Sequence, residues 1–122
     1  MRKQSFILLI GLLVLSACAS SSYHKISTSK AKSMMEDSNA IIVDVRTLEE
    51  YNEGHIAGAI LIPNESISSV QPAQLPDKDA VILIYCRSGN RSKQAADKLV
   101  AMGYTKIYDF GGIIDWTYGT VK

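Results

Sequence analysis

Short apolar runs alternate with amphipathic segments along the chain after residue 22. The strands expected from these runs are residues 23–26, 40–45, 59–62, 80–85 and 106–110. The runs at 40–45 and 80–85 are almost continuously apolar and rich in β-branched residues, which is typical of strands buried on both faces of a parallel sheet. Strands of this kind, separated by amphipathic segments, predict an α/β fold.

The amphipathic segments between the runs predict helices. The expected helices are residues 28–36, 48–53 and 91–102, with shorter ones at 65–70 and after residue 112. In the segment 91–102, Ala95, Leu99 and Met102 recur at helical spacing, so they are expected on one apolar face. Pro72 and Pro76 indicate a loop over the rest of the connection between the third and fourth strands.

The beginning of the chain has a different pattern. Arg2 and Lys3 precede an apolar run over residues 6–15, and small residues follow it. A membrane-spanning helix needs about 20 apolar residues. This run is shorter, so it fits a secretory signal better. Residues 15–18, Leu-Ser-Ala-Cys, resemble the lipobox of bacterial lipoproteins.

The lipobox resemblance implies processing and anchoring. Residues 1–17 would be a signal peptide that is removed, Cys18 would carry acyl chains, and residues 18–22 would tether the lipid to a domain at 23–122. The protein would then be exported and anchored to a bacterial membrane, with its domain in the periplasm or outside the cell. The alternative is an ordinary signal peptide that leaves Cys18 as a free thiol.

Composition and charge argue against nucleic-acid binding and against a metal site. A chain of 122 residues suits one domain. The formal net charge of +1, with basic and acidic residues interspersed, gives no footprint for nucleic acid. No cluster of His, Cys and carboxylates has metal-ligand spacing, so no metal site is expected.

Cysteine usage singles out one residue. The chain has two cysteines, and if Cys18 is acylated then Cys86 has no partner within the chain. An unpaired thiol in an oxidising compartment is a liability unless it is used. This makes Cys86 the candidate nucleophile.

Cys86 follows the most apolar strand run and precedes a polar loop that leads into a helix. This order places it at the carboxyl end of a parallel strand, where open α/β sheets bind their ligands. The loop residues expected to bind an anion are Arg87, Ser88, Gly89, Asn90, Arg91 and Ser92. Their amides can converge at the helix N-terminus, with Gly89 supplying a positive φ. The two arginines add positive charge, although a purely structural role for Arg91 stays open.

A series of motifs resembles the single-domain rhodaneses. The motifs are Asp44-Val45-Arg46, Glu49-Glu50-Tyr51, Gly-His-Ile-Ala-Gly-Ala at 54–59, the loop Cys86–Ser92, and Gly111-Gly112 followed by Trp116. The resemblance implies a five-stranded parallel sheet flanked by helices on both faces. It also implies that Cys86 takes a sulfur from a small anionic donor such as thiosulfate. The resulting persulfide would pass that sulfur to cyanide or to a thiol, including a protein thiol. The resemblance further implies that no metal or organic cofactor is needed, because the enzyme itself carries the sulfur.

The other motif residues are expected to support the site. Asp44 and Arg46 would brace the neighbouring loop, with Arg46 paired to Glu49 or Glu50. His55 is expected to hold backbone through hydrogen bonds and not to act as a base.

Two other functions are weighed against sulfur transfer. Cysteine phosphatases and arsenate reductases resemble this sequence in using a cysteine loop that ends in arginine, but with five residues between the two. Only four residues separate Cys86 from Arg91, and a shorter loop suits a single sulfur atom better than a tetrahedral phosphate. A non-catalytic, membrane-tethered sulfur carrier or sensor would use nearly the same residues, so the sequence leaves it open.

Overall fold

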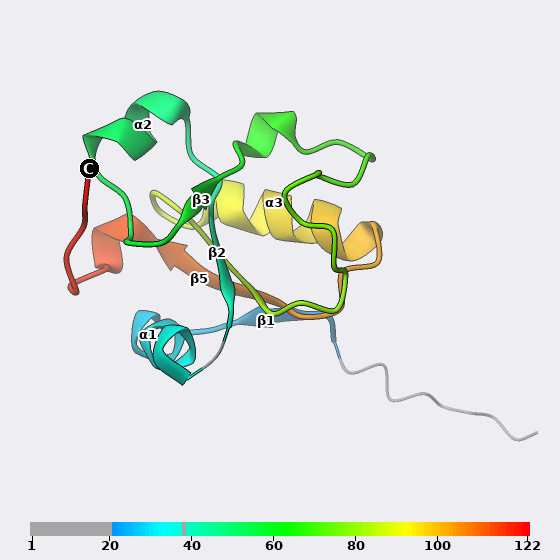
Figure 1. Cartoon of the computed structure of the whole chain (residues 1–122), viewed down its shortest axis with the longest axis horizontal. Coiled ribbons are helices and arrows are strands. Elements are labelled where there is room, and N and C mark those ends of the chain that lie inside the picture. Colours follow the sequence, from blue (N-terminus) through cyan, green and yellow to red (C-terminus); the bar gives the residue numbers. More distant parts are fainter. Residues whose placement is uncertain (1–20, 38) are drawn as a thin grey trace, which may run out of the picture.

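The computed structural model describes residues 21–37 and 39–122 as an α/β fold around one parallel sheet (Figure 1). The strands are β1 (Tyr23–Lys25), β2 (Ile41–Asp44), β3 (Ile60–Leu61), β4 (Ile82–Cys86) and β5 (Ile107–Gly112). The helices are α1 (Thr28–Asp37), α2 (Leu48–Glu53) and α3 (Asn90–Ala101), with 3₁₀ turns η1 (Asn64–Ser66) and η2 (Ile113–Asp115). The strand order is β1-β5-β4-β2-β3, and every pairing is parallel.

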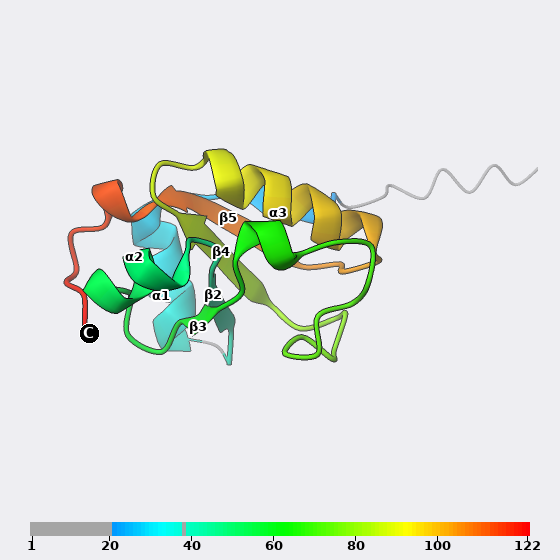
Figure 2. The same cartoon turned by 90° about the horizontal axis from the view of Figure 1, so that it is seen from above.

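Helices cover both faces of the sheet, as predicted (Figure 2). Every residue of β4 is buried, and its side chains alternate between two cores. Ile82, Ile84 and Cys86 pack in the core that contains the inner face of α3. Leu83 and Tyr85 belong to the core on the other face, which includes Ala31 of α1. This double burial explains why the β4 sequence is continuously apolar.

Several predicted boundaries are wrong in detail, among them the following three. Strand β5 does not end at residue 110 but continues to Gly112, which pairs with Cys86 after a register shift between Ile84 and Cys86. Strand β3 has only two residues. The helix expected at 65–70 is the single turn η1, where the Ser66 hydroxyl donates to the Pro63 carbonyl and so favours a local turn over a helix.

The predicted export signal and Cys18 lie outside the described residues. Ser22, the last residue of the predicted tether, is already bound to the sheet, because its carbonyl accepts a hydrogen bond from the Ile107 amide of β5 at 2.9 Å. Within residues 21–37 and 39–122, no helix has the length and apolar character needed to cross a membrane.

Candidate active site

Cys86 lies at the carboxyl end of the sheet, as predicted, but it is the last residue of β4 and not the first residue after the strand. Its relative exposure is 1 %, and it is a free cysteine. The Gly89 amide donates a hydrogen bond to the Cys86 Sγ at 3.0 Å. Gly89 has φ +109° and directly precedes α3, so the expected positive φ and the curled loop are both present. The sulfur is therefore held at the start of a helix, with an amide hydrogen directed at it.

The loop after Cys86 is packed against the end of β5. The Ile114 amide donates to the Arg87 carbonyl at 3.3 Å. The Ser92 hydroxyl, which is buried, lies 3.0 Å from the Gly89 carbonyl oxygen and 3.5 Å from that of Gly111. A Cβ atom on Gly112 would lie 2.6 Å from the Ser88 Cα and would overlap the Arg87 carbonyl. Glycine at 112 is thus what lets β5 approach the loop this closely.

A buried carboxylate behind the loop was not identified from the sequence. Asp109 is fully buried, and its carboxylate accepts the Gly111 amide at 2.9 Å and the Tyr23 hydroxyl at 2.9 Å. Burial and the hydrogen bond to Asp109 raise the pKa of Tyr23 above its usual range. An acid inside the otherwise apolar strand Ile107–Phe110 was the available signal. Asp109 fixes the turn at Gly111, which in turn contacts the Ser92 hydroxyl.

Arg91 is held by a carboxylate from another helix. Its guanidinium forms two hydrogen bonds with Glu50, at 2.6 and 2.9 Å. The bond from Arg91 holds the pKa of Glu50 down at about 2, and the same contact raises the pKa of Arg91. The positive charge expected from Arg91 is therefore balanced within the site. Arg87 is exposed and forms no ion pair among the described residues.

Asp44 and Arg46 form a buried pair beside the site. Arg46 donates from Nη2 to Asp44 Oδ2 at 2.7 Å and to the Gly54 carbonyl at 2.7 Å. The predicted pairing of Arg46 with Glu49 or Glu50 is wrong. Asp44 lies two residues away at the same strand end, and Glu50 is already engaged by Arg91. The pair ties the end of β2 to the turn after α2.

His55 also has a local role in the structure. Its Nδ1 donates to the Tyr51 carbonyl at 2.9 Å, and its ring stacks on the Tyr51 ring at 3.7 Å between centroids. This agrees with the expectation that His55 holds backbone. In the described part of the chain, no three His, Cys, Asp or Glu side chains come together in a way that could hold a metal ion.

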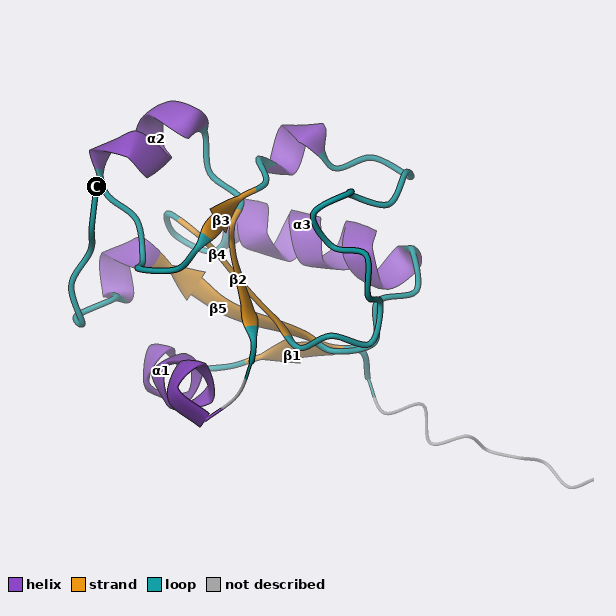
Figure 3. Ribbon diagram, viewed as in Figure 1, coloured by secondary structure: helices purple, strands orange, loops and turns teal. Residues whose placement is uncertain are grey.

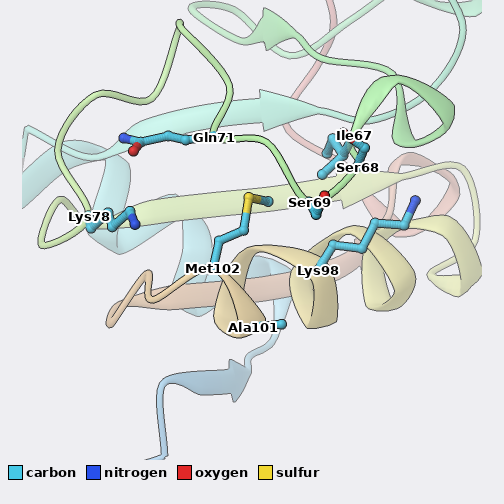
Figure 4. A pocket seen from close by; sticks show the side chains of 8 residues that line it. All are labelled: Ile67, Ser68, Ser69, Gln71, Lys78, Lys98, Ala101 and Met102. Atoms are coloured by element: carbon cyan, nitrogen blue, oxygen red, sulfur yellow. The ribbon is translucent and has the colours of Figure 1, made fainter.

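A groove of about 480 Å³ lies elsewhere, between the long connection before β4 and the C-terminal end of α3 (Figure 4). Figure 4 shows Met102 between Lys78 at one end and Lys98 at the other. The complete lining is Ile67, Ser68, Ser69, Gln71, Lys78, Lys98, Ala101 and Met102. None of the predicted site residues borders this groove, so it is separate from the Cys86 loop.

Known proteins are similar to this chain in both sequence and fold. The family described as "Rhodanese-like domain" matches residues 27–118. Thiosulfate sulfurtransferase PspE of Escherichia coli is 38% identical over 80 residues, which are 66% of this chain and 77% of that protein. Thiosulfate sulfurtransferase GlpE of Pseudomonas entomophila is 34% identical over 92 residues, or 75% and 82% of the two chains. The solved structure of a rhodanese with anions from E. coli has a TM-score of 0.62 and 37% identity, covering 68% of this chain and 98% of that one.

Proposed function

Because this chain belongs to the rhodanese-like domain family, we propose that it is a sulfurtransferase that carries sulfur as a persulfide on Cys86. The observation that carries this proposal is the position of the Cys86 Sγ, at the end of β4, with the Gly89 amide donating to it at 3.0 Å. An amide donor suits the negative charge of the Cys86 thiolate, which is on Sγ. The arrangement therefore fits the thiolate that attacks the sulfur donor and that is regenerated when the sulfur is passed on.

The proposed reaction has two steps. In the first, the Cys86 thiolate attacks the outer sulfur of thiosulfate; a new sulfur–sulfur bond forms, and the old one breaks with its electron pair leaving on sulfite. In the second, cyanide attacks the terminal sulfur of the persulfide, thiocyanate leaves, and the electron pair returns to the Cys86 Sγ. A covalent intermediate of this kind gives ping-pong kinetics. Names of relatives that include thiosulfate support the choice of donor.

The loop geometry counts against a phosphatase or an arsenate reductase. Such an enzyme needs the arginine at the end of the loop to face a bound oxyanion. In this chain the Arg91 guanidinium is bound on two nitrogens by Glu50. Arg87 is left as the exposed cation of the loop, and it directly follows Cys86.

The experiment that tests this proposal is intact-mass analysis with thiosulfate. Cys18→Ala is the matched control because it removes the other cysteine and keeps Cys86. We expect the full-length protein and Cys18→Ala to gain the mass of one sulfur atom and to produce thiocyanate from cyanide. Cys86→Ser should do neither. Thiocyanate production by Cys86→Ser at the wild-type rate would rule out Cys86 as the sulfur carrier. A persulfide that forms but never turns over with cyanide or thiols would favour the non-catalytic carrier instead.

The location of the protein is a second part of the proposal. We propose that Cys18 is acylated and that the domain is exported and held at a bacterial membrane. The support is the lipobox at residues 15–18 after a short apolar run and a basic start.

A further inference from the structure

Two large apolar side chains are exposed on either side of the Cys86 loop. Leu48, at the start of α2, is 61 % exposed, and Ile114, in η2, is 63 % exposed. Helix α2 follows β2 and η2 follows β5, and β4 lies between these two strands. The loop after β4 therefore emerges between α2 and η2 (Figure 3). The Ile114 amide contacts the loop directly, through the Arg87 carbonyl.

An exposed acidic residue follows each of these two apolar residues in the sequence. Leu48 is followed by Glu49 and Ile114 by Asp115, and both acids are exposed. Within residues 21–37 and 39–122, neither acid forms an ion pair. The Glu50–Arg91 pair between α2 and α3 is balanced in charge. The loop after Cys86 is thus flanked by two elements, each of which carries an exposed apolar residue followed by an exposed carboxylate, and Arg87 of the loop is exposed as well.

Small substrates do not account for these exposed side chains. Thiosulfate and cyanide have no apolar surface to cover Leu48 or Ile114, and neither carries a positive charge that would pair with the two carboxylates. A partner that carries its own apolar and basic side chains would gain from burying the first and pairing with the second. Because the Cys86 side chain is buried, such a partner must also bring its acceptor atom down to the sulfur on a projecting segment.

We propose that Leu48, Glu49, Ile114 and Asp115 form an acceptor rim, which docks a protein whose cysteine is flanked by apolar and basic side chains. The proposal rests on the proposed sulfurtransferase function and names the class of its acceptor. The acceptor thiolate attacks the terminal sulfur of the Cys86 persulfide. The sulfur–sulfur bond to Cys86 breaks, its electron pair returns to Sγ, and the acceptor leaves as a persulfide.

Peptide acceptors test the rim. The two probes are short peptides with one cysteine, flanked by Leu and Lys in the first and by Ser and Glu in the second, and cyanide is the small reference acceptor. For the full-length protein, we expect kcat/KM to be roughly tenfold higher for the Leu/Lys peptide, because burying one large apolar side chain corresponds to about that factor in affinity. In Leu48→Ser and Ile114→Ser, the ratio of kcat/KM for this peptide to that for cyanide should fall by a similar factor.

Val70→Ser is the matched control, since Val70 is 73 % exposed and lies in the connection before β4, away from the loop. It should keep the wild-type ratio. Equal rates with both peptides in the wild type, or an unchanged ratio in both rim variants, would overturn the rim while leaving the sulfurtransferase function intact. Failure to form a persulfide with thiosulfate would instead overturn the proposed function, and the rim with it.

Discussion

At the scale of single residues, Glu50 determines how much positive charge surrounds Cys86. Its carboxylate accepts hydrogen bonds from both terminal nitrogens of Arg91. It also accepts one from the Thr47 amide, in the capping box of α2. The Glu50 side chain therefore caps the first turn of α2 and also joins α2 to the residue that ends the Cys86 loop. Both members of the ion pair are about one quarter exposed, so the pair is partly shielded from solvent.

Replacing Glu50 with Gln should remove the ion pair while leaving a side chain that can still cap α2. The folded-state pKa of Glu50, about 2, lies below its ordinary value of 4.5. The stability that the ion pair contributes is therefore fully present above pH 4.5 and is lost as the pH falls toward 2. We expect Glu50→Gln to lower the free energy of unfolding by about 1–2 kcal/mol at pH 7. The difference from wild type should shrink at pH 3, as measured by urea unfolding at both pH values.

Glu49→Gln is the control for this prediction, because Glu49 is the exposed neighbour without an ion pair among the described residues. It should unfold like the wild type at both pH values. A loss in Glu50→Gln that stays the same from pH 7 to pH 3 would mean that capping, and not the charge pair, is the source of the stability.

At the scale of elements, the end of β5 acts as the template for the Cys86 loop. The pairing of β5 with β4 shifts register between Ile84 and Cys86, and after this shift Gly112 lies against the loop backbone. The buried Asp109 fixes the turn at Gly111, just before Gly112. Strand β1 contributes through the Tyr23 hydroxyl. The conformation of the loop therefore depends on a strand that carries none of the loop residues.

Gly112→Ala should disturb this template directly. Gly112 has φ −125°, a conformation that alanine adopts without strain, so the obstacle is overlap of the new methyl group with the Arg87 carbonyl and the Ser88 Cα. Overpacking of this kind costs about 1–3 kcal/mol, and here relief requires movement of the loop. We expect Gly112→Ala to lower the Tm, measured by thermal unfolding, and also to lower the rate of thiocyanate production per folded molecule, measured by a cyanide assay.

Gly119→Ala provides the comparison. Gly119 has φ +90°, and a methyl group added there would meet no atom within 4 Å, so alanine costs about 1–2 kcal/mol in backbone strain alone. Its Tm should fall while its activity per folded molecule stays at the wild-type level. Full activity in Gly112→Ala would show that the loop does not depend on its contact with β5.

The elements were easier to predict than their contacts. Strand β4 and helix α3 follow from apolar runs and helical spacing, which are local properties of the sequence. The contact of Arg91 with Glu50 spans 41 residues, and that of Tyr23 with Asp109 spans 86. Which carboxylate meets which cation depends on how α2 packs against α3. The local prediction for Arg46 failed because a nearer acid, Asp44, lies beside it in the folded strand end.

At the scale of the whole molecule, the parallel sheet gives the domain two distinct ends. Tyr23 pairs with Ile107, and Ile107 pairs with Ile82, so the chain enters the sheet level with the start of β4. Cys86 lies four residues further along β4, about 13 Å away at 3.3 Å per residue. Tyr23, where the described chain enters the sheet, and the reactive thiol are therefore at opposite ends of the sheet, so anchoring through the residues before Tyr23 would leave the site on the side away from the anchor.

This polarity predicts that anchoring does not obstruct the site. We expect the full-length protein to sediment with membranes and Cys18→Ala to remain in the supernatant, while both transfer sulfur from thiosulfate to cyanide with the same kcat/KM. Cys86→Ser is the control for anchoring, because it should sediment like the wild type and be inactive. Sedimentation of Cys18→Ala with the membranes would contradict the lipid anchor. If kcat/KM of the membrane-bound full-length protein were several-fold lower than that of Cys18→Ala, the proposed orientation would be wrong. Such a result would mean that the carboxyl end of the sheet faces the bilayer.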